Sequence, residues 1–308
     1  MQSFVSPSAG YGKVTVRILL LLNPNARRGA QSAEAVEKAF DVEQCEVIRE
    51  EPDQNDGGAR IMKRYVGEVD CVAVGGGDGT LINAIPGLIE TKLPLGILPL
   101  GTFNDLAKTL GVPVDLEGAV RVILDGNKRA LDVGRVAGRY FLNEASIGIS
   151  TRIARRQTPE AKKRFGFLAI IATTLAALVK SRPFSATVRY DGKEERFRTL
   201  QLTVANSHHF GGFITNKDAA IDDGMLDLYS LDIHNWADVM RLLGPIARHE
   251  ISQSPAVRNR KSTQFEVLTT RPRAVFTDGE PAAMTPAMFT VLPAAIEVFV
   301  PRDGTPSK

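Results

Sequence analysis

The stretch Val72-Ala73-Val74-Gly75-Gly76-Gly77-Asp78-Gly79-Thr80 decides the fold, because an apolar run passes directly into glycines and then into a predicted helix. Glycines lack a Cβ atom, so their backbone N–H groups approach an anion closely, and the helix N-terminus adds positive potential. The pattern therefore favours a loop that binds phosphate, with Asp78 placed to hold Mg²⁺ or to orient the phosphate. The alternative is a tight strand-to-helix turn in which Asp78 or Thr80 only caps the helix.

A second loop of the same design follows in the segment Ile97-Leu98-Pro99-Leu100-Gly101-Thr102-Phe103-Asn104-Asp105-Leu106-Ala107. It again combines an apolar strand, a glycine, a hydroxyl and a polar pair that opens a helix. Open α/β sheets bind ligands at the carboxyl ends of their strands. Two such loops in neighbouring strand–helix units therefore predict one nucleotide cleft.

The chain up to about residue 129 alternates strands with helices, which predicts a parallel sheet covered on both faces. We expect a flexible tail at 1–12 and an α/β domain at 13–129. Pro86 should start or kink the helix portion beyond residue 84. The expected strands are 14–22, 45–48, the run before Gly75 and 94–98, and the expected helices are 33–40, 58–65, one after Thr80, one from Asn104 and 115–126.

From about residue 130 the pattern changes to short runs rich in β-branched and aromatic residues, separated by Gly and Asn, which predicts a mainly antiparallel β domain over 130–308. Asp191-Gly192 is a hairpin signal. The expected strands are 131–136, 140–149, 186–190, 197–205, 226–231, 265–268, 274–277 and 296–300, with one helix at 236–246.

One segment, near 152–181, interrupts this β pattern as a helical insertion. It carries a cluster of Arg and Lys followed by the apolar run 165–179. A basic collar on an apolar helix suits contact with a lipid surface. A buried crossover helix with solvated flanks is the alternative.

Composition sets broad limits on the partners and the compartment. The 308 residues are 44% hydrophobic and 24% charged, and 38 Lys and Arg against 35 Asp and Glu leave a net charge of +3, so no strong field favours nucleic acid. Cys45 and Cys71 have no metal-binding spacing and read as reduced core residues of a cytosolic protein. The apolar run 18–22 is too short for a signal peptide, and 165–179 is too short to span a bilayer.

Five short motifs occur in order along most of the chain: Asn23-Pro24 with Gly29, Gly76-Gly77-Asp78-Gly79-Thr80, Gly101-Thr102-Phe103-Asn104-Asp105, Asp222-Asp223-Gly224-Met225-Leu226-Asp227, and Asp278-Gly279-Glu280. In this combination they resemble the diacylglycerol kinase catalytic-domain superfamily, in particular its soluble bacterial lipid kinases. The resemblance implies an α/β fold with an N-terminal parallel-sheet nucleotide-binding domain, followed by a mainly antiparallel β-sandwich domain that takes the lipid substrate.

The resemblance also implies roles for individual residues. Asp78 and Asp105 would organise the phosphates and the catalytic Mg²⁺, and Glu280 would accept the proton of the attacking hydroxyl. ATP would be bound by Asn23, Gly76, Gly77, Asp78, Gly79, Thr80, Gly101, Thr102 and Asn104. No lysine of the common P-loop type is present, so backbone amides and Mg²⁺ must balance the phosphate charge.

A second, structural Mg²⁺ is implied at the Asp223 side chain and the backbone carbonyls of Ala220 and Met225, since hard cations take oxygen ligands. A simple turn into the following strand explains the same residues. The chain also departs from the family pattern. It has Leu81-Ile82-Asn83-Ala84 where an apolar residue and then Asn-Glu usually follow the glycine loop, and Lys217 where proline is usual.

Taken together, the residues predict an ATP- and Mg²⁺-dependent lipid kinase that is cytoplasmic and visits the membrane surface transiently. A NAD kinase-like or other soluble-substrate kinase is one rival, although the Gly101 to Asp105 and Asp278 to Glu280 motifs argue against it. A catalytically silent nucleotide-binding regulator is another, which has no use for Glu280. The sequence does not identify the acceptor alcohol, does not distinguish ATP from GTP, and does not decide whether the protein forms a homodimer.

Overall fold

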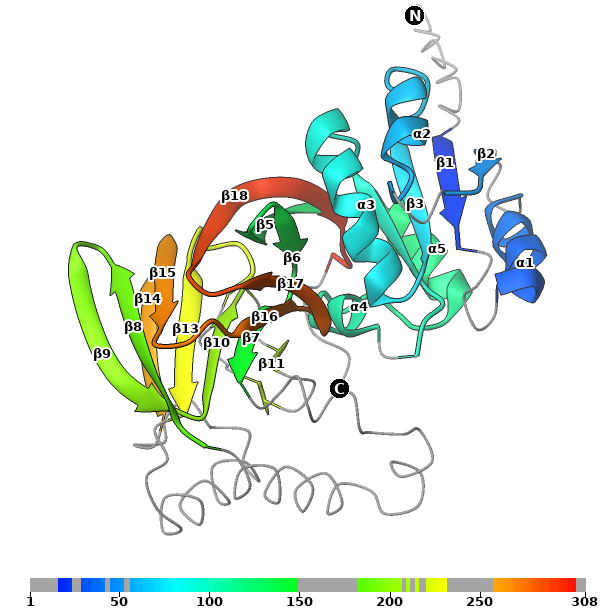
Figure 1. Cartoon of the computed structure of the whole chain (residues 1–308). Coiled ribbons are helices and arrows are strands. Elements are labelled where there is room, and N and C mark those ends of the chain that lie inside the picture. Colours follow the sequence, from blue (N-terminus) through cyan, green and yellow to red (C-terminus); the bar gives the residue numbers. More distant parts are fainter. Residues whose placement is uncertain are drawn as a thin grey trace, which may run out of the picture.

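The protein is described by a computed structural model that covers residues 16–23, 29–41, 45–52, 56–102, 104–148, 182–206, 209–210, 214–215, 220–231 and 257–302. Its N-terminal half is a parallel sheet with helices on both faces, drawn in blue and cyan in Figure 1. The strands β1 (Arg17–Leu22), β2 (Glu46–Glu50), β3 (Cys71–Gly76) and β4 (Leu95–Pro99) run parallel in the order β2-β1-β3-β4. The helices are α1 (Gly29–Asp41), α2 (Ala59–Arg64), α3 (Asp78–Thr91), α4 (Asp105–Thr109) and α5 (Leu116–Leu124).

The three inner strands β1, β3 and β4 are almost entirely buried. Both of their faces are covered, which is why they read as continuous apolar runs instead of alternating ones. Helix α1 packs against α5, and α2 packs against α3. The predicted parallel sheet is thus confirmed. No new helix starts at Pro86, because it lies inside α3, where packing against the sheet outweighs the one lost backbone hydrogen bond; the alternative, a kink, stays a prediction.

The C-terminal half is built from antiparallel strands that form two facing sheets. Among the described residues, one sheet has six strands in the order β14-β13-β10-β7-β16-β17, and the other continues the parallel sheet into a ten-stranded one. The core between the two sheets contains buried Phe265 and Phe289 from one side and Val204 and Leu228 from the other. The predicted fold class, a parallel α/β domain followed by a mainly antiparallel β-sandwich, is confirmed.

The strands of this half are β5 (Lys128–Val136), β6 (Arg139–Phe141), β7 (Glu144–Gly148), β8 (Phe184–Tyr190), β9 (Lys193–Thr199), β10 (Gln201–Ala205), β11 (His209–Phe210), β12 (Ile214–Thr215), β13 (Leu226–Leu231), β14 (Val257–Ser262), β15 (Gln264–Thr269), β16 (Ala274–Thr277), β17 (Glu280–Met284) and β18 (Ala287–Phe299).

Strand β18 joins the two halves of the molecule, arching between them in red in Figure 1. Its first part pairs with β15, and near its end Val298 pairs with Leu95 of β4. The register against β5 shifts between Leu292 and Ile296, which marks a bulge. One carboxylate holds this bulge, because Asp132 of β5 accepts a hydrogen bond from the Ala294 N–H at 2.8 Å.

Two predicted strands are wrong in their extent. The run 140–149 divides into β6 and β7, and the run 197–205 divides into β9 and β10, with each pair split between different sheets. The second break is held by the Thr199 hydroxyl, which donates to the carbonyls of Gln201 (2.7 Å) and Leu231 (3.0 Å). Strands β14, β17 and the first half of β18 were not expected from the sequence.

Some expectations lie outside the described residues: the tail at 1–12, the insertion near 152–181 and the helix at 236–246. The domain boundary at 129/130 stays a prediction, since β5 begins at Lys128 and β18 places both halves in one sheet.

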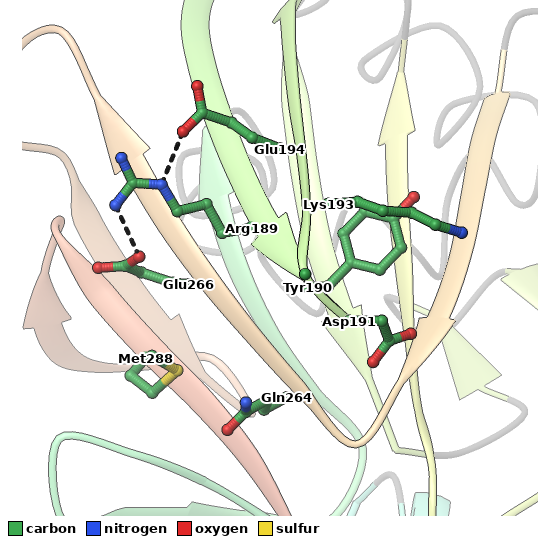
Figure 2. Close-up of a pocket in the computed structure, with 9 residues that line it drawn as sticks. Arg189, Tyr190, Asp191, Lys193, Glu194, Gln264, Glu266 and Met288 are labelled. Carbon is green, nitrogen blue, oxygen red and sulfur yellow. Dashed lines mark hydrogen bonds and ion pairs between the residues drawn. The ribbon is translucent and has the colours of Figure 1, made fainter.

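The outer face of the sandwich carries charged cross-strand pairs and an open cavity of about 400 Å³ (Figure 2). Arg189 of β8 bonds Glu194 of β9 at 2.8 Å and Glu266 of β15 at 3.1 Å. The cavity also borders the Asp191-Gly192 turn, whose φ angles of 46° and 71° confirm the predicted hairpin. None of the residues lining this cavity belongs to the two glycine loops.

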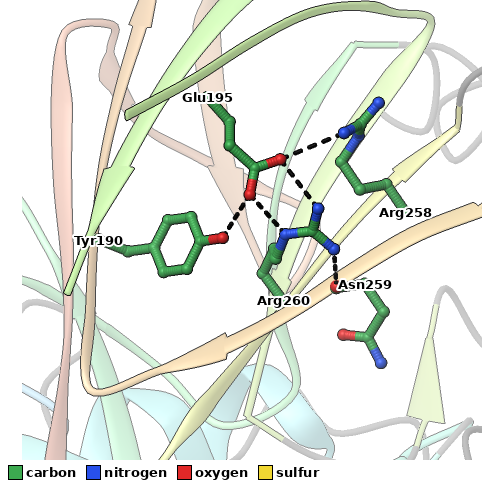
Figure 3. A network of polar contacts seen from close by, with 5 residues as sticks. All are labelled: Tyr190, Glu195, Arg258, Asn259 and Arg260. Atoms are coloured by element: carbon green, nitrogen blue, oxygen red, sulfur yellow. Dashed lines mark hydrogen bonds and ion pairs between the residues drawn. The ribbon is translucent and has the colours of Figure 1, made fainter. Parts of the chain in front are cut away.

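Glu195 connects the two sheets where their edge strands meet (Figure 3). It lies on the core-facing side of β9, and its carboxylate accepts hydrogen bonds from Arg260 Nε at 2.6 Å and Arg258 Nη1 at 3.1 Å, both on β14. The Tyr190 hydroxyl donates to it as well. The hydrogen bond from Arg260 is the main cause that lowers the pKa of Glu195 to about 2. An inward-pointing charge also makes an edge strand a poor template for further strands.

We expect Glu195→Gln to lower the free energy of unfolding by about 2 kcal/mol at pH 7, the linkage value reduced for partial exposure. Because the folded-state pKa lies below the ordinary value of 4.5, this stability is present above pH 4.5 and is lost as the pH falls toward 2. Urea titrations at pH 7 and pH 3 should show a difference that shrinks with acid. Glu194→Gln, on the exposed face of β9, is the control with little expected change, and an unaltered midpoint for Glu195→Gln would contradict the assignment.

Candidate active site

The first glycine loop connects the end of β3 to the start of α3. The Gly77 carbonyl accepts hydrogen bonds from the N–H groups of Thr80 (2.9 Å) and Leu81 (3.2 Å), which begins the helix directly after the glycines. Asn23, at the end of β1, donates from Nδ2 to the Thr80 hydroxyl at 3.1 Å. The neighbouring strand thus reaches the same edge of the sheet, and Asn23 and Thr80, both expected at an ATP site, contact each other.

The second loop is shaped by the side chain of Asn104. This residue is 7% exposed and adopts φ of 50°, a left-handed conformation that asparagine tolerates better than most residues. Its Oδ1 accepts from the Gly101 N–H at 3.0 Å, and its Nδ2 donates to the carbonyls of Gly101 (3.1 Å) and Pro99 (3.3 Å). Asn104 therefore uses its amide to hold the loop, while Thr102 lies exposed at the tip.

The two loops touch through their backbones. A Cβ atom built on Gly101 would lie 2.4 Å from the Gly77 Cα atom, well inside any real contact distance. The Leu100 N–H also donates to the Gly76 carbonyl at 3.0 Å. Glycine is required at Gly101 because any side chain would push the loops apart. The loops predicted to share one cleft are thus in direct contact.

Asp78 links the two loops through its carboxylate. Its Oδ1 accepts a hydrogen bond from the Leu106 N–H of α4 at 3.2 Å. Burial raises the pKa of Asp78, and repulsion from the neighbouring Asp105 carboxylate adds to that rise. Asp105 itself lies 3.8 Å from the Lys108 ammonium. Two carboxylates close enough to repel each other are oxygen donors of the kind that Mg²⁺ takes, so the residues fit the expected catalytic ion.

Glu280 stands at the start of β17, exposed, directly after a two-residue turn. The turn residues Asp278 and Gly279 have φ of 46° and 91°, the geometry of a tight hairpin. The Asp278 carboxylate accepts three backbone hydrogen bonds, from the N–H groups of Leu142 (2.9 Å), Asn143 (3.0 Å) and Glu144 (3.0 Å). Burial raises the pKa of Asp278 to about 6, although these three N–H groups act in the opposite direction.

The β16–β17 hairpin is connected, through the residues that bond Asp278, to the part of the core that lies beneath the glycine loops. Leu142 is buried in the same hydrophobic cluster as Leu81 and Leu106, the residues that follow the two loops in α3 and α4. Strand β6, which ends one residue before Leu142, packs on α3. The turn that receives Asp278 is therefore fixed against the elements that carry the loops.

The expected structural Mg²⁺ site, at Ala220, Asp223 and Met225, has a different set of partners in the structure. Asp223 Oδ1 accepts from the Met225 N–H at 3.0 Å, and Oδ2 lies 2.5 Å from the Lys261 ammonium. The oxygen donors suit Mg²⁺, but an ion at Asp223 would have to displace Lys261. The described residues hold no cluster of three His, Cys, Asp or Glu side chains arranged for a metal. This metal site stays a prediction.

The contacts of two carboxylates, Asp132 and Asp278, are not predicted by the sequence. Asp132, 3% exposed, accepts from the Gly224 N–H at 2.6 Å and so anchors the loop just described to β5. The sequence signal that could have identified Asp132 is its position as a single charged residue between Leu131 and Val133 of β5. Asp278 belongs to the Asp278-Gly279-Glu280 motif, but locally an Asp-Gly pair indicates only a hairpin turn, so the sequence predicts no partners for its carboxylate.

We expect Gly101→Ala to destabilise the protein by about 1–3 kcal/mol, the range for an added group that forces a backbone shift, and to weaken nucleotide binding. The reason is the 2.4 Å approach to the Gly77 backbone. Gly79→Ala is the folding control, because a Cβ atom there meets nothing within 4 Å. Thermal melts with and without ATP check both variants, and equal melting temperatures would contradict the packing argument.

Comparison with known proteins agrees with this geometry. Residues 17–136 match the family described as diacylglycerol kinase catalytic domain, and residues 143–300 match the YegS C-terminal NAD kinase beta sandwich-like domain. The chain is 30% identical over 240 residues to a diacylglycerol kinase of Bacillus subtilis (strain 168), across 77% of this chain and 79% of that protein. It is 29% identical over 239 residues to a diacylglycerol kinase of Staphylococcus epidermidis, across 77% and 76% of the two chains.

A crystal structure of a diacylglycerol kinase from Bacillus anthracis strain Sterne has the same fold. Its TM-score is 0.75 at 24% sequence identity, and the match covers 96% of this chain and 100% of that one. The resemblance carried by the sequence motifs is confirmed, and the chain belongs to the diacylglycerol kinase family.

Proposed function

We propose that this protein is an ATP- and Mg²⁺-dependent lipid kinase that transfers the γ-phosphate to a hydroxyl of diacylglycerol or a related lipid. The observation that carries the proposal is the backbone contact between the loops at Gly77 and Gly101, with Asp78 and Asp105 beside it. Membership of a kinase family supports phosphoryl transfer, and the lipid acceptor follows the names of the relatives.

The loops are suited to hold a triphosphate by their backbone. Phosphoryl transfer needs alignment of the reacting groups and neutralisation of the charge on the transferred phosphoryl group more than covalent chemistry. Glycines at 76, 77, 79 and 101 let N–H groups approach the phosphates, and the α3 N-terminus adds its dipole. Mg²⁺ held by Asp78 and Asp105 would neutralise phosphate charge when it is bound.

Glu280 is the proposed proton acceptor for the attacking hydroxyl. Its carboxylate is exposed and stands at the end of a hairpin that is fixed against the N-terminal core. A general base must lie within hydrogen-bond reach of the proton that it takes. The substrate hydroxyl would therefore enter between the glycine loops and the β16–β17 hairpin.

We further propose that the enzyme works in the cytoplasm and meets its lipid at a membrane surface. None of the helices in the described ranges combines the length and apolarity that a bilayer crossing requires. The basic and apolar segment 152–181 remains the predicted contact with lipid headgroups, and it lies outside the described residues.

The direct test is transfer of labelled γ-phosphate from ATP or GTP to a panel of acceptors. The panel holds diacylglycerol, monoacylglycerol and ceramide in mixed micelles, with NAD and glycerol as soluble alcohols. Mg²⁺-dependent labelling of a lipid supports the proposal. Labelling of NAD alone would support a soluble-substrate kinase instead, and the absence of labelling with bound ATP would indicate a nucleotide-binding regulator.

We expect Glu280→Gln to lower kcat by about 10²-fold to 10⁴-fold, the usual contribution of a general base, while ATP affinity stays within about twofold. Gln keeps the size and hydrogen-bonding ability of the side chain but cannot take a proton. Calorimetric titration of ATP and steady-state kinetics measure the two effects separately. Wild-type turnover in this variant would show that another group is the base.

Asp78→Asn should abolish the Mg²⁺ dependence of nucleotide binding, because the variant loses one of two charges near the expected ion. Asp115→Asn is the matched control, since Asp115 also accepts a hydrogen bond at a helix start, from Gly118 N–H at 2.7 Å, away from both loops. Binding isotherms with Mg²⁺ and with EDTA would refute the assignment if Asp78→Asn and the wild type responded alike.

A further inference from the structure

The turn Leu142-Asn143-Glu144 between β6 and β7 has all of its backbone groups bonded to two other residues. Its three N–H groups donate to the Asp278 carboxylate, and the Glu144 carbonyl accepts from the Asp278 N–H at 2.9 Å. Asn206, at the end of β10, donates to the carbonyls of Leu142 (3.3 Å) and Asn143 (2.8 Å). A turn whose six backbone groups are satisfied from outside has little freedom to move.

The Leu142–Glu144 turn also contacts the part of the core that lies behind the glycine loops. The Leu142 side chain lies in the core with Leu81 and Leu106, and β6 packs on α3. Asp278 lies on the opposite side, at the tip of the β16–β17 hairpin, and the first residue of β17 is Glu280. The Asp278 carboxylate thus connects the N-terminal core to the strand that carries Glu280, in addition to the pairing of β16 with β7.

The Asp278-Gly279 hairpin turn does not need the Asp278 carboxylate to adopt its conformation. The other Asp-Gly hairpin, at Asp191-Gly192, has the same signs of φ, and Asp191 accepts its hydrogen bond from the Ser262 hydroxyl at 2.8 Å without any backbone cluster. Burial of the Asp278 charge is unfavourable, as its raised pKa of about 6 indicates. A partly buried carboxylate that the hairpin conformation does not need is the kind of feature that functional sites retain.

We infer that Asp278 is a positioning residue, whose bonds to the Leu142–Glu144 turn set the place of the Glu280 carboxylate relative to the glycine loops. The inference rests on the proposed function, in which Glu280 takes the proton from the acceptor hydroxyl. Asp278 takes no part in the chemistry itself. Displacement of a reacting group by about 1 Å lowers rates by as much as 10²-fold, so the tether has a measurable effect.

Two substitutions test this tether, by which we mean the hydrogen bonds from the Leu142–Glu144 turn to the Asp278 carboxylate, without straining the Asp278-Gly279 turn. Asp278→Asn keeps the shape but turns one acceptor into a donor, and Asp278→Gly removes the carboxylate while allowing the positive φ. The matched controls are Asp191→Asn and Asp191→Gly in the equivalent hairpin. We expect both Asp278 variants to lower kcat tenfold or more in the lipid kinase assay, with the KM for ATP within twofold and wild-type kcat in both controls.

Hydrogen exchange provides a readout that does not depend on turnover. The amides of Leu142, Asn143 and Glu144 should exchange faster in both Asp278 variants than in the wild type and the Asp191 controls. If their exchange is unchanged, the tether does not hold the turn and the inference fails. If exchange rises while kcat stays at the wild-type value, the tether exists but does not position Glu280, and the inference also fails.

A double-mutant cycle separates positioning from general destabilisation. If Asp278 acts through Glu280, adding Asp278→Asn to Glu280→Gln should lower the remaining rate by less than twofold. A tenfold loss in both backgrounds would mean that Asp278 acts independently of Glu280, which overturns the inference. If the wild type transfers no phosphate to any acceptor, the proposed function fails and takes this inference with it. If the wild type is active, only the inference is at stake.

Discussion

The close approach of two peptide backbones at Gly77 and Gly101 is the constraint on which the candidate active site depends. A methyl group at Gly101 would overlap the Gly77 backbone, so the two strand ends can meet only as glycines. Their contact places the start of α3 beside the start of α4, where Asp78 accepts the Leu106 N–H. One steric requirement therefore brings together the backbone N–H groups and the two carboxylates that we propose as the phosphate and Mg²⁺ site.

A second constraint fixes the position of the β-sandwich relative to the candidate active site. Strand β18 pairs with β4 of the parallel sheet and with β15 of the sandwich, so one sheet runs through both halves of the molecule. Asp132 holds the bulge in β18 through Ala294 and, with its other oxygen, the loop at Gly224. Losing either hydrogen bond would leave one oxygen of this buried carboxylate without that partner, which is unfavourable, so both segments are held in place. The sandwich is thus joined to the sheet that carries the first glycine loop.

The parts that sequence predicted well are those in which local pattern and burial agree. Continuous apolar runs predicted β1, β3 and β4, because parallel strands are covered on both faces. Glycines followed by a polar residue predicted both loops. Prediction failed at two changes of sheet, at Leu142 and at Leu200, where a buried leucine separates two strands and no glycine or proline marks the break. It also missed β17, whose proline and alanines suit an edge strand but signal no strand.

By itself the sequence determined the parallel α/β class, the glycine motifs and the family, because each depends on residues adjacent or periodic along the chain. Only the tertiary structure decided which side chains hold the site together. Asn104 uses its amide on its own loop, Asp223 pairs with Lys261, and Asp278 bonds amides 134 to 136 residues away. The physical reason is that a hydrogen bond depends on distance in space, and the folded sheet sets that distance between segments whose local sequence carries no trace of the partner.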